Sequence, residues 1–126
     1  MWVCTQDGFF SITRVPEMLD HSQIRSRSKR HLANLKATVR NAYGVVDRGI
    51  SDEIAKAEIV QKPHGDYKYR ILVSPEAVSQ VMNLYGQLVT YDNFKNAVSA
   101  SQQSSDDDKY YQFLTTVWSF GLSLED

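Results

Sequence analysis

The sequence predicts an α+β protein built on a single, mostly antiparallel sheet, with helices on one face and an aromatic helix near its C-terminal end. Two observations carry this prediction. Short β-prone runs come in pairs joined by turn residues, as in Trp2–Gln6 and Phe9–Thr13. Stretches with apolar residues at helical spacing, such as 74–88, follow those pairs. Packing one sheet against a layer of helices buries the apolar faces of both.

Length and composition fit one folded domain covering residues 1–126. The formal net charge is −1, so an electrostatic partner must be recognised through a local patch rather than through bulk charge. The single cysteine, Cys4, cannot form an internal disulfide, which favours a reducing compartment. No apolar run approaches the ~20 residues of a membrane span, and no signal-peptide pattern opens the chain. We therefore expect a soluble cytoplasmic protein with no membrane partner.

The chain opens with a predicted hairpin. Its strands are Trp2–Gln6 and Phe9–Thr13, and Asp7-Gly8 between them suits a two-residue type I′ turn. That turn needs φ > 0 at both central residues. The following segment, 15–22, contains a proline and a polar cluster and is interpreted as a loop.

A short third strand is predicted over Gln23–Arg27. Alternation places Arg25 and Arg27 on one side of this strand, and Ile24 and Ser26 on the other.

A helix is predicted from Ser28, as N-cap, to about Tyr43. Its apolar residues recur at helical spacing, as Leu32, Leu35, Val39 and Ala42. Two interpretations stay open for 45–56: a short helix starting at Ser51, or a surface loop.

A second hairpin and a second helix follow. Ala57–Lys62 and Asp66–Val73 flank the turn residues 63–65. Ser74 is a suitable N-cap with proline at the first helical position, and the helix is expected to reach about Leu88.

The last third of the chain is predicted to be helical. Asp92 caps a short helix over Asn93–Ala100, and the polar run 99–108 is a linker. Ser105, together with Asp108, begins a final helix to about Leu122.

The order of these elements favours a known topology. The central strand-helix-strand-strand-helix part is compatible with a ferredoxin-like split β-α-β arrangement. We expect the other face of the sheet to be partly open unless the C-terminal helix or a second subunit covers it.

Several runs of residues together resemble a family of small uncharacterised bacterial proteins. Those proteins open with a similar Met-Trp-x-x-Thr-x-x-Gly-Phe-Phe-Ser hairpin, carry a Tyr-x-Asn-Phe-Lys segment and end in a Trp-containing helix. The runs that carry the resemblance in this chain are 1–5, 8–11, 25–27, 66–70, 91–96 and Val117-Trp118. The chain departs from the family in a longer middle, 43–56, and in its Ser/Asp-rich linker. The resemblance implies no catalytic or ligand residues.

A basic patch is the strongest candidate for a functional site. Its predicted partner-binding residues are Arg25, Arg27, Lys29, Arg30, Lys68 and Arg70. Alternation in the second hairpin places Tyr67 and Tyr69 on the face opposite Lys68 and Arg70. Arginine clusters suit recognition of phosphate or carboxylate groups. The alternative interpretation is a solvated strand edge that charge protects from aggregation.

Catalytic and metal chemistry find little support. Cys4 lies in a predicted strand outside any nucleophile motif, and the three histidines are scattered as His21, His31 and His64. The run 106–108 lacks the alternating spacing of a calcium loop. We predict no catalytic residue, no metal site and no cofactor.

The final helix carries more aromatic surface than one sheet contact needs. This width implies either deep burial or a homodimer contact. The candidate dimer residues are Tyr111, Trp118 and Phe120.

Taken together, these features favour a small non-enzymatic binding or regulatory module that contacts an acidic protein or a nucleic acid through the basic patch. Two alternatives stay open: a small enzyme with a pocket between the sheet and the C-terminal helices, and a phage- or defence-associated inhibitor protein. A pocket with convergent polar groups would favour the enzyme, and a flat basic or aromatic face would favour the binding module.

Overall fold

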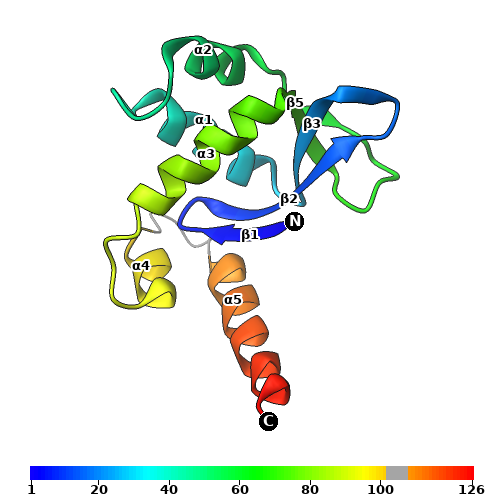
Figure 1. The fold of residues 1–126 in the computed structure, drawn as a ribbon. Helices are drawn as coiled ribbons and strands as arrows, with labels where there is room; N and C mark the ends of the chain where they lie inside the picture. The colour runs from blue at the N-terminus through cyan, green and yellow to red at the C-terminus, as the bar shows by residue number, and fades with distance from the viewer. Residues whose placement is uncertain (102–107) are drawn as a thin grey trace. The chain divides into compact units, whose positions relative to one another are not determined.

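The computed structural model describes residues 1–101 and 108–126, which form two compact units, Met1–Thr90 and Tyr91–Asp126 (Figure 1). The predicted single domain of residues 1–126 stays a prediction. The elements of the first unit are β1 Trp2–Thr5, β2 Gly8–Val15, β3 Met18–Ser26, α1 Lys29–Arg40, α2 Arg48–Lys56, β4 Val60–Gln61, β5 Tyr69–Val73 and α3 Pro75–Gln87. Those of the second unit are α4 Phe94–Ser101, α5 Asp108–Gly121 and the short 3-10 helix η2 Leu122–Leu124.

One five-stranded sheet organises the first unit. Its strand order is β1-β2-β3-β5-β4, and all neighbouring strands are antiparallel. Strand β5 therefore lies between β3 and β4, which run parallel and are joined through α1 and α2. This is the split β-α-β arrangement expected from the element order. The predicted α+β class with one antiparallel sheet is confirmed.

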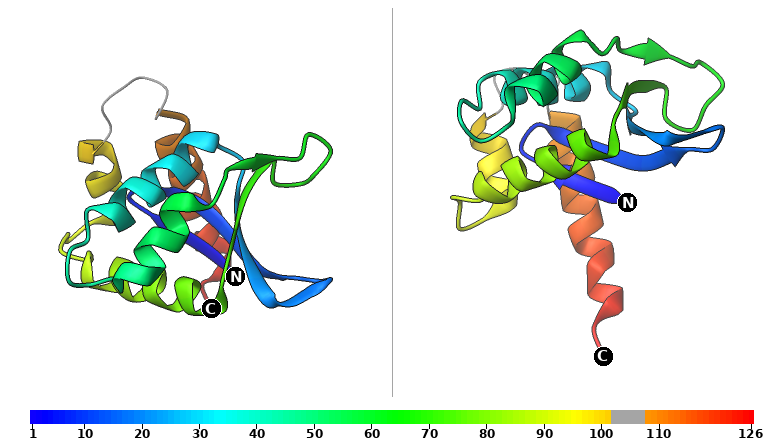
Figure 2. Two further views of the ribbon diagram at one scale, coloured as in Figure 1. Left: turned by 90° about the horizontal axis from the view of Figure 1, so that it is seen from above. Right: turned by 45° about the horizontal axis from the view of Figure 1, so that its top comes forward.

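The hydrophobic core lies between this sheet and its helices (Figure 2). Helix α1 contacts β2, β3 and β5, and α3 contacts β3. The sheet contributes apolar side chains that alternate along its strands, and the helices contribute residues at helical spacing. The buried set includes Phe10, Ile12, Ile24, Ile71 and Val73 from the sheet, Leu32, Leu35 and Val39 from α1, and Val81 and Leu84 from α3.

The first hairpin forms, but with a different turn. Thr5 pairs with Gly8, so the two loop residues are Gln6 and Asp7. Asp7 does not have a positive φ, whereas Gly8 has φ 153°. The predicted type I′ turn over Asp7-Gly8 is therefore wrong.

Tertiary hydrogen bonds to Asp7 account for this difference. The carboxylate Oδ2 of Asp7 accepts hydrogen bonds from the hydroxyls of Thr38 and Tyr85, both at 2.7 Å. The backbone oxygen of Asp7 accepts a hydrogen bond from the side-chain amide of Asn34 at 3.2 Å. These bonds join the hairpin loop to α1 and α3, so partners far away in the sequence fix the loop.

A second correction concerns the segment 15–22, which was expected to be a loop. Strand β2 continues to Val15 and β3 begins at Met18, with a turn at Pro16-Glu17. The expected short strand, Gln23–Arg27, is the inner end of this longer β3. The outer end is exposed, with Leu19 at 70%. It is held by backbone pairing with β2 rather than by burial, so its composition is that of a loop.

Helix boundaries in the middle of the chain also differ from expectation. Helix α1 ends at Arg40 rather than Tyr43, and the Ser28 side chain makes no capping hydrogen bond. Of the two interpretations for 45–56, a helix forms, and it starts before Ser51. The Asp47 carboxylate accepts hydrogen bonds from the backbone of the first turn of α2, which places the start at Arg48.

Ser74 caps α3 as predicted. Its hydroxyl accepts a hydrogen bond from the Ala77 backbone at 3.1 Å. The carboxylate of Glu53, on α2, accepts hydrogen bonds from the backbone N–H of Ser74 at 3.0 Å and from its hydroxyl at 2.9 Å. Glu53 thereby joins α2 to the start of α3.

The second unit contains α4 and α5. The side chain of Asn93, rather than Asp92, accepts the capping hydrogen bond, from the backbone of Asn96 at 3.0 Å. Helix α5 is described from Asp108 to Gly121. The expected helix start at Ser105 and most of the expected linker lie outside the described residues.

A test of the first hairpin uses Gly8. A Cβ built at this position would lie 2.2 Å from Cγ of His31, and the backbone adopts a positive φ. We predict that Gly8→Ala and Gly8→Val lower the free energy of unfolding by about 1–3 kcal/mol, because strain of this kind costs that much. Urea denaturation followed by circular dichroism measures the change.

The matched control for this test is Gly86→Ala. Gly86 lies in α3, and an added Cβ there meets no atom within 4 Å. Gly86→Ala should preserve or slightly raise stability, because alanine favours helix. Equal stability of Gly8→Ala and wild type would contradict the close packing of this hairpin on His31.

Candidate anion-binding site

The face of the sheet opposite the helices carries a row of polar side chains. Register places Ser11, Arg25 and Arg70 directly opposite one another on β2, β3 and β5. Their neighbours in the chain, Ile24 and Ile71, are fully buried in the core. Nη2 of Arg25 donates a hydrogen bond to the Ser11 hydroxyl at 2.8 Å, across the two strands. Alternation therefore holds both arginines on the outer face.

Hydrogen bonds fix the position of Arg70. Its Nη1 donates to the side-chain oxygen of Gln23 at 3.0 Å, and its Nη2 donates to the backbone oxygen of Tyr67 at 3.1 Å. The Gln23 amide in turn donates to the Thr13 hydroxyl at 3.0 Å. The guanidinium group is thus held in one orientation by neutral partners.

The ring of Tyr67 joins two further guanidinium groups. The ring is buried, and the guanidinium carbons of Arg25 and Arg27 lie 4.9 and 5.0 Å from its centroid. These distances are those of cation–π contacts. The predicted common side of Arg25 and Arg27 is confirmed. We call the set Arg25, Arg27, Tyr67 and Arg70 the arginine face.

The expected position of Tyr67 is wrong. Tyr67 was expected on the opposite face from Arg70, together with Tyr69. The strand begins only at Tyr69, which packs against the core. Because Tyr67 precedes β5, strand alternation does not govern its side chain, and the ring reaches the arginine side.

The positive charge of this face is largely uncompensated by the protein. Within the described residues, the one carboxylate in ion-pair range of the arginine face is Asp66, 3.9 Å from Arg27, and both of those side chains are mostly exposed. The Nε atoms of Arg25 and Arg70 are buried and have no hydrogen-bond partner in the described structure. Other carboxylates serve elsewhere, since Asp47 caps α2 and Glu53 binds Ser74.

Electrostatics at Arg70 show the consequence. Burial of the guanidinium group, followed by repulsion from Arg25, lowers the pKa of Arg70 below its ordinary value. An arginine stays charged at neutral pH despite such a shift. Two like charges therefore face each other across neighbouring strands, an arrangement that an anion would stabilise.

The other predicted site residues lie on separate elements. Lys29 and Arg30 begin α1. Lys68 is exposed in the segment before β5. The candidate dimer residues, Tyr111, Trp118 and Phe120, lie on α5, where Trp118 is 59% and Phe120 74% exposed. The ammonium group of Lys95, on α4, lies 4.3 Å from the Trp118 ring centroid.

Aromatic side chains that sequence reasoning left out of the site lie beside the arginine face. The ring centroids of Trp2 and Phe9 are 6.1 Å apart, and those of Phe9 and Tyr67 are 6.3 Å apart. Pairing of Trp2 with Ser11 places Trp2 and Phe9 on the same face as Arg25. The register of the first hairpin is the sequence signal that could have found them.

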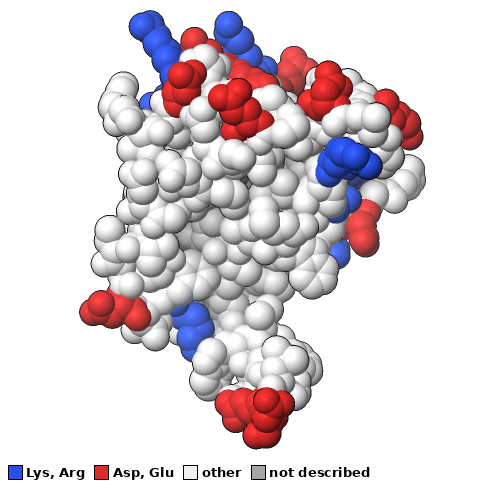
Figure 3. Space-filling view, viewed as in Figure 1, with Lys and Arg blue, Asp and Glu red and all other residues white. Residues whose placement is uncertain are grey.

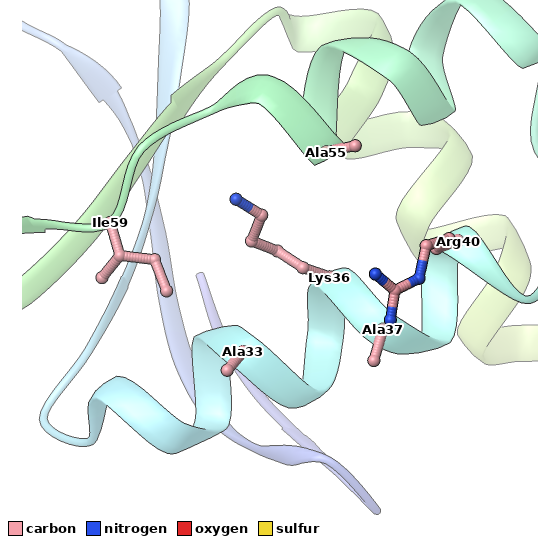
Figure 4. A pocket seen from close by; sticks show the side chains of 6 residues that line it. All are labelled: Ala33, Lys36, Ala37, Arg40, Ala55 and Ile59. Atoms are coloured by element: carbon pink, nitrogen blue, oxygen red, sulfur yellow. The ribbon is translucent and has the colours of Figure 1, made fainter.

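A pocket elsewhere in the first unit lacks catalytic groups. It has a volume of about 290 Å³ and lies between α1 and the end of α2 (Figure 4). Its lining residues are Ala33, Lys36, Ala37, Arg40, Ala55 and Ile59. The Lys36 ammonium group donates to the backbone oxygen of Ala57. This lining offers no nucleophile and no acid–base pair. On the outer surface near α2, acidic and basic side chains are mixed (Figure 3).

Other candidate chemical groups are dispersed. Burial raises the pKa of the Cys4 thiol, which disfavours the nucleophilic thiolate. His21 pairs with Asp20, and His31 accepts a hydrogen bond from the Phe9 backbone. No three potential metal ligands gather among the residues that the structure describes. Over the same residues, none of the helices combines the length and the apolar character that crossing a membrane requires.

Comparisons with protein-family models, with curated proteins and with solved structures each found no match to this chain.

A double-mutant cycle tests the like-charge pair. If Arg25 and Arg70 repel each other, Arg25→Gln and Arg70→Gln each relieve the same repulsion, and the double variant relieves it only once. The double variant should then lose more stability than the sum of the two single losses. The excess should be roughly 0.2–1 kcal/mol, the usual size of a cross-strand pair.

Urea denaturation at low ionic strength measures this excess, and added salt should reduce it through screening. A double variant that loses less than the sum would indicate that the two arginines attract through a shared group, contrary to the structure.

Proposed function

We propose that this protein is a small non-enzymatic module that binds an acidic partner through the arginine face. The observation that carries the proposal is the pair Arg25 and Arg70, which face each other in register with neutral hydrogen-bond partners. Guanidinium groups held in fixed orientations are suited to phosphate and carboxylate groups. An acidic protein and a nucleic acid both supply such groups.

Two features favour binding over catalysis. The pocket between α1 and α2 is lined by apolar residues and two cations, without convergent acid and base. The arginine face, by contrast, spreads over three neighbouring strands, as an interaction surface would. The enzyme and inhibitor alternatives draw no comparable support from a particular group of residues. Cytoplasmic location and membership of the small bacterial family that the chain resembles are proposed alongside this function.

Loss of two arginines tests the proposal. Heparin and polyglutamate, each fluorescently labelled, serve as acidic probes at low salt. We predict that Arg25→Gln combined with Arg27→Gln weakens binding roughly 10-fold or more, because a hydrogen bond to a charged group contributes about 1.5–3 kcal/mol. The melting temperature should stay nearly unchanged, because exposed charges contribute little to stability.

The matched control removes the same charge elsewhere, as Arg40→Gln combined with Arg48→Gln. Both control residues are exposed. The control should bind both probes almost as wild type does. If the two double variants lose binding equally, the effect is one of net charge, and the arginine face is not the site.

We also infer that α5 contacts a second copy of the chain. Several apolar side chains near its end are exposed, among them Val117, Trp118, Phe120, Leu122 and Leu124. Residues 110–124 carry no charged side chain, so two copies could meet there without burying a charge.

The dimer proposal predicts a change in molecular mass. Trp118→Ala combined with Phe120→Asp should shift the mass measured by light scattering towards that of one chain. Tyr43→Asp, which alters a 90% exposed aromatic residue of the first unit, should not. A wild-type protein that is strictly monomeric at high micromolar concentration would contradict the dimer.

A further inference from the structure

We propose that the acidic partner is single-stranded nucleic acid, whose phosphates contact the arginine face while its bases stack on Trp2 and Phe9. This inference rests on the proposed function, because it names the chemical class of the partner. It adds two residues that the electrostatic proposal does not use.

The first step concerns the two rings. Trp2 lies on the edge strand β1, and 75% of the residue is exposed. Its ring meets that of Phe9 edge to face, with 72° between the planes. An edge-to-face contact leaves the faces of the Trp2 ring unstacked by Phe9, so they are available to another aromatic group.

The second step is the continuity of rings and charges. Phe9 contacts Tyr67, and Tyr67 carries the guanidinium groups of Arg25 and Arg27 at about 5 Å. Aromatic and cationic groups therefore adjoin on one face of the sheet. Each nucleotide of a single strand supplies both an anionic phosphate and an unpaired base, so one strand can engage both kinds of group.

The third step compares the possible acidic partners. Proteins that bind single strands combine positive charge along the backbone path with aromatic rings on which bases stack, and aromatic residues on the face of a sheet serve this purpose in RNA recognition. A duplex keeps its base faces stacked inside the helix. An acidic protein would use the arginines but would leave the exposed Trp2 ring beside them unexplained.

Removing the exposed ring is the main test. Fluorescein-labelled oligothymidylate and oligouridylate are titrated with the full chain at low salt, and labelled heparin serves as an acidic probe without bases. Trp2→Ala should weaken oligonucleotide binding by between about 5-fold and 100-fold, since stacking contributes about 1–3 kcal/mol per base. Binding of heparin should stay unchanged.

Two further variants separate stacking from loss of structure. Trp2→Phe should restore most of the affinity for oligonucleotides, because it keeps an aromatic face. Tyr43→Ala removes an aromatic residue that is 90% exposed at another place and should leave affinity unchanged. Circular dichroism and the melting temperature confirm that each variant is folded.

Fluorescence gives a direct readout of stacking. The chain has two tryptophans, Trp2 and Trp118, so Trp2 is the only one left in a Trp118→Phe variant. Emission from Trp2 should fall when oligothymidylate binds and should stay constant when heparin binds.

The outcomes distinguish this inference from the proposed function. Heparin binding that depends on Arg25 and Arg27, combined with wild-type oligonucleotide affinity in Trp2→Ala, would overturn the stacking inference and leave the proposed function standing. Tighter binding of duplex or of polyglutamate than of a single strand, with unchanged Trp2 emission, would also overturn it. Failure of the wild-type protein to bind any acidic probe at low salt would overturn both.

Discussion

The two-residue period of the β-strands is the constraint on which the rest of this structure depends. Burial of Phe10, Ile24 and Ile71 beneath α1 and α3 fixes the register of the three central strands. Alternation then sends Arg25 and Arg70 to the other face, directly opposite each other. A slip of one residue would bury the arginines in the core, at a cost far above the stability of a small domain. The core thus determines where the charges gather.

Polar contacts secure the helices that make this core. Asp7 binds side chains of both α1 and α3, and Glu53 joins α2 to Ser74 at the start of α3. Each carboxylate satisfies groups that packing would otherwise leave without partners. The acidic residues that might have neutralised the arginines are therefore engaged elsewhere. The chain has a net charge of −1, yet it carries a locally positive face.

That positive face is a local departure from the rules that stabilise a sheet. Like charges directly opposite on neighbouring strands destabilise the pair, and most sheets place opposite charges or apolar residues there. Tyr67 and Gln23 hold the guanidinium groups without neutralising them. Departures of this kind are expected where a surface serves a partner rather than the stability of the fold. The aromatic pair Trp2 and Phe9 beside the arginines follows the same logic.

Much of the architecture follows from the sequence by itself, because turn residues, capping serines and apolar spacing act locally. They indicate the α+β class, the hairpins, the start of α3 at Ser74 and the common side of Arg25 and Arg27. Contacts between distant residues decided the remainder. The turn at Gln6-Asp7 depends on partners in α1 and α3, and the outer half of β3 on backbone pairing with β2. The place of Tyr67 depends on a segment outside the strand period, so only the tertiary structure could assemble the arginine face around its ring.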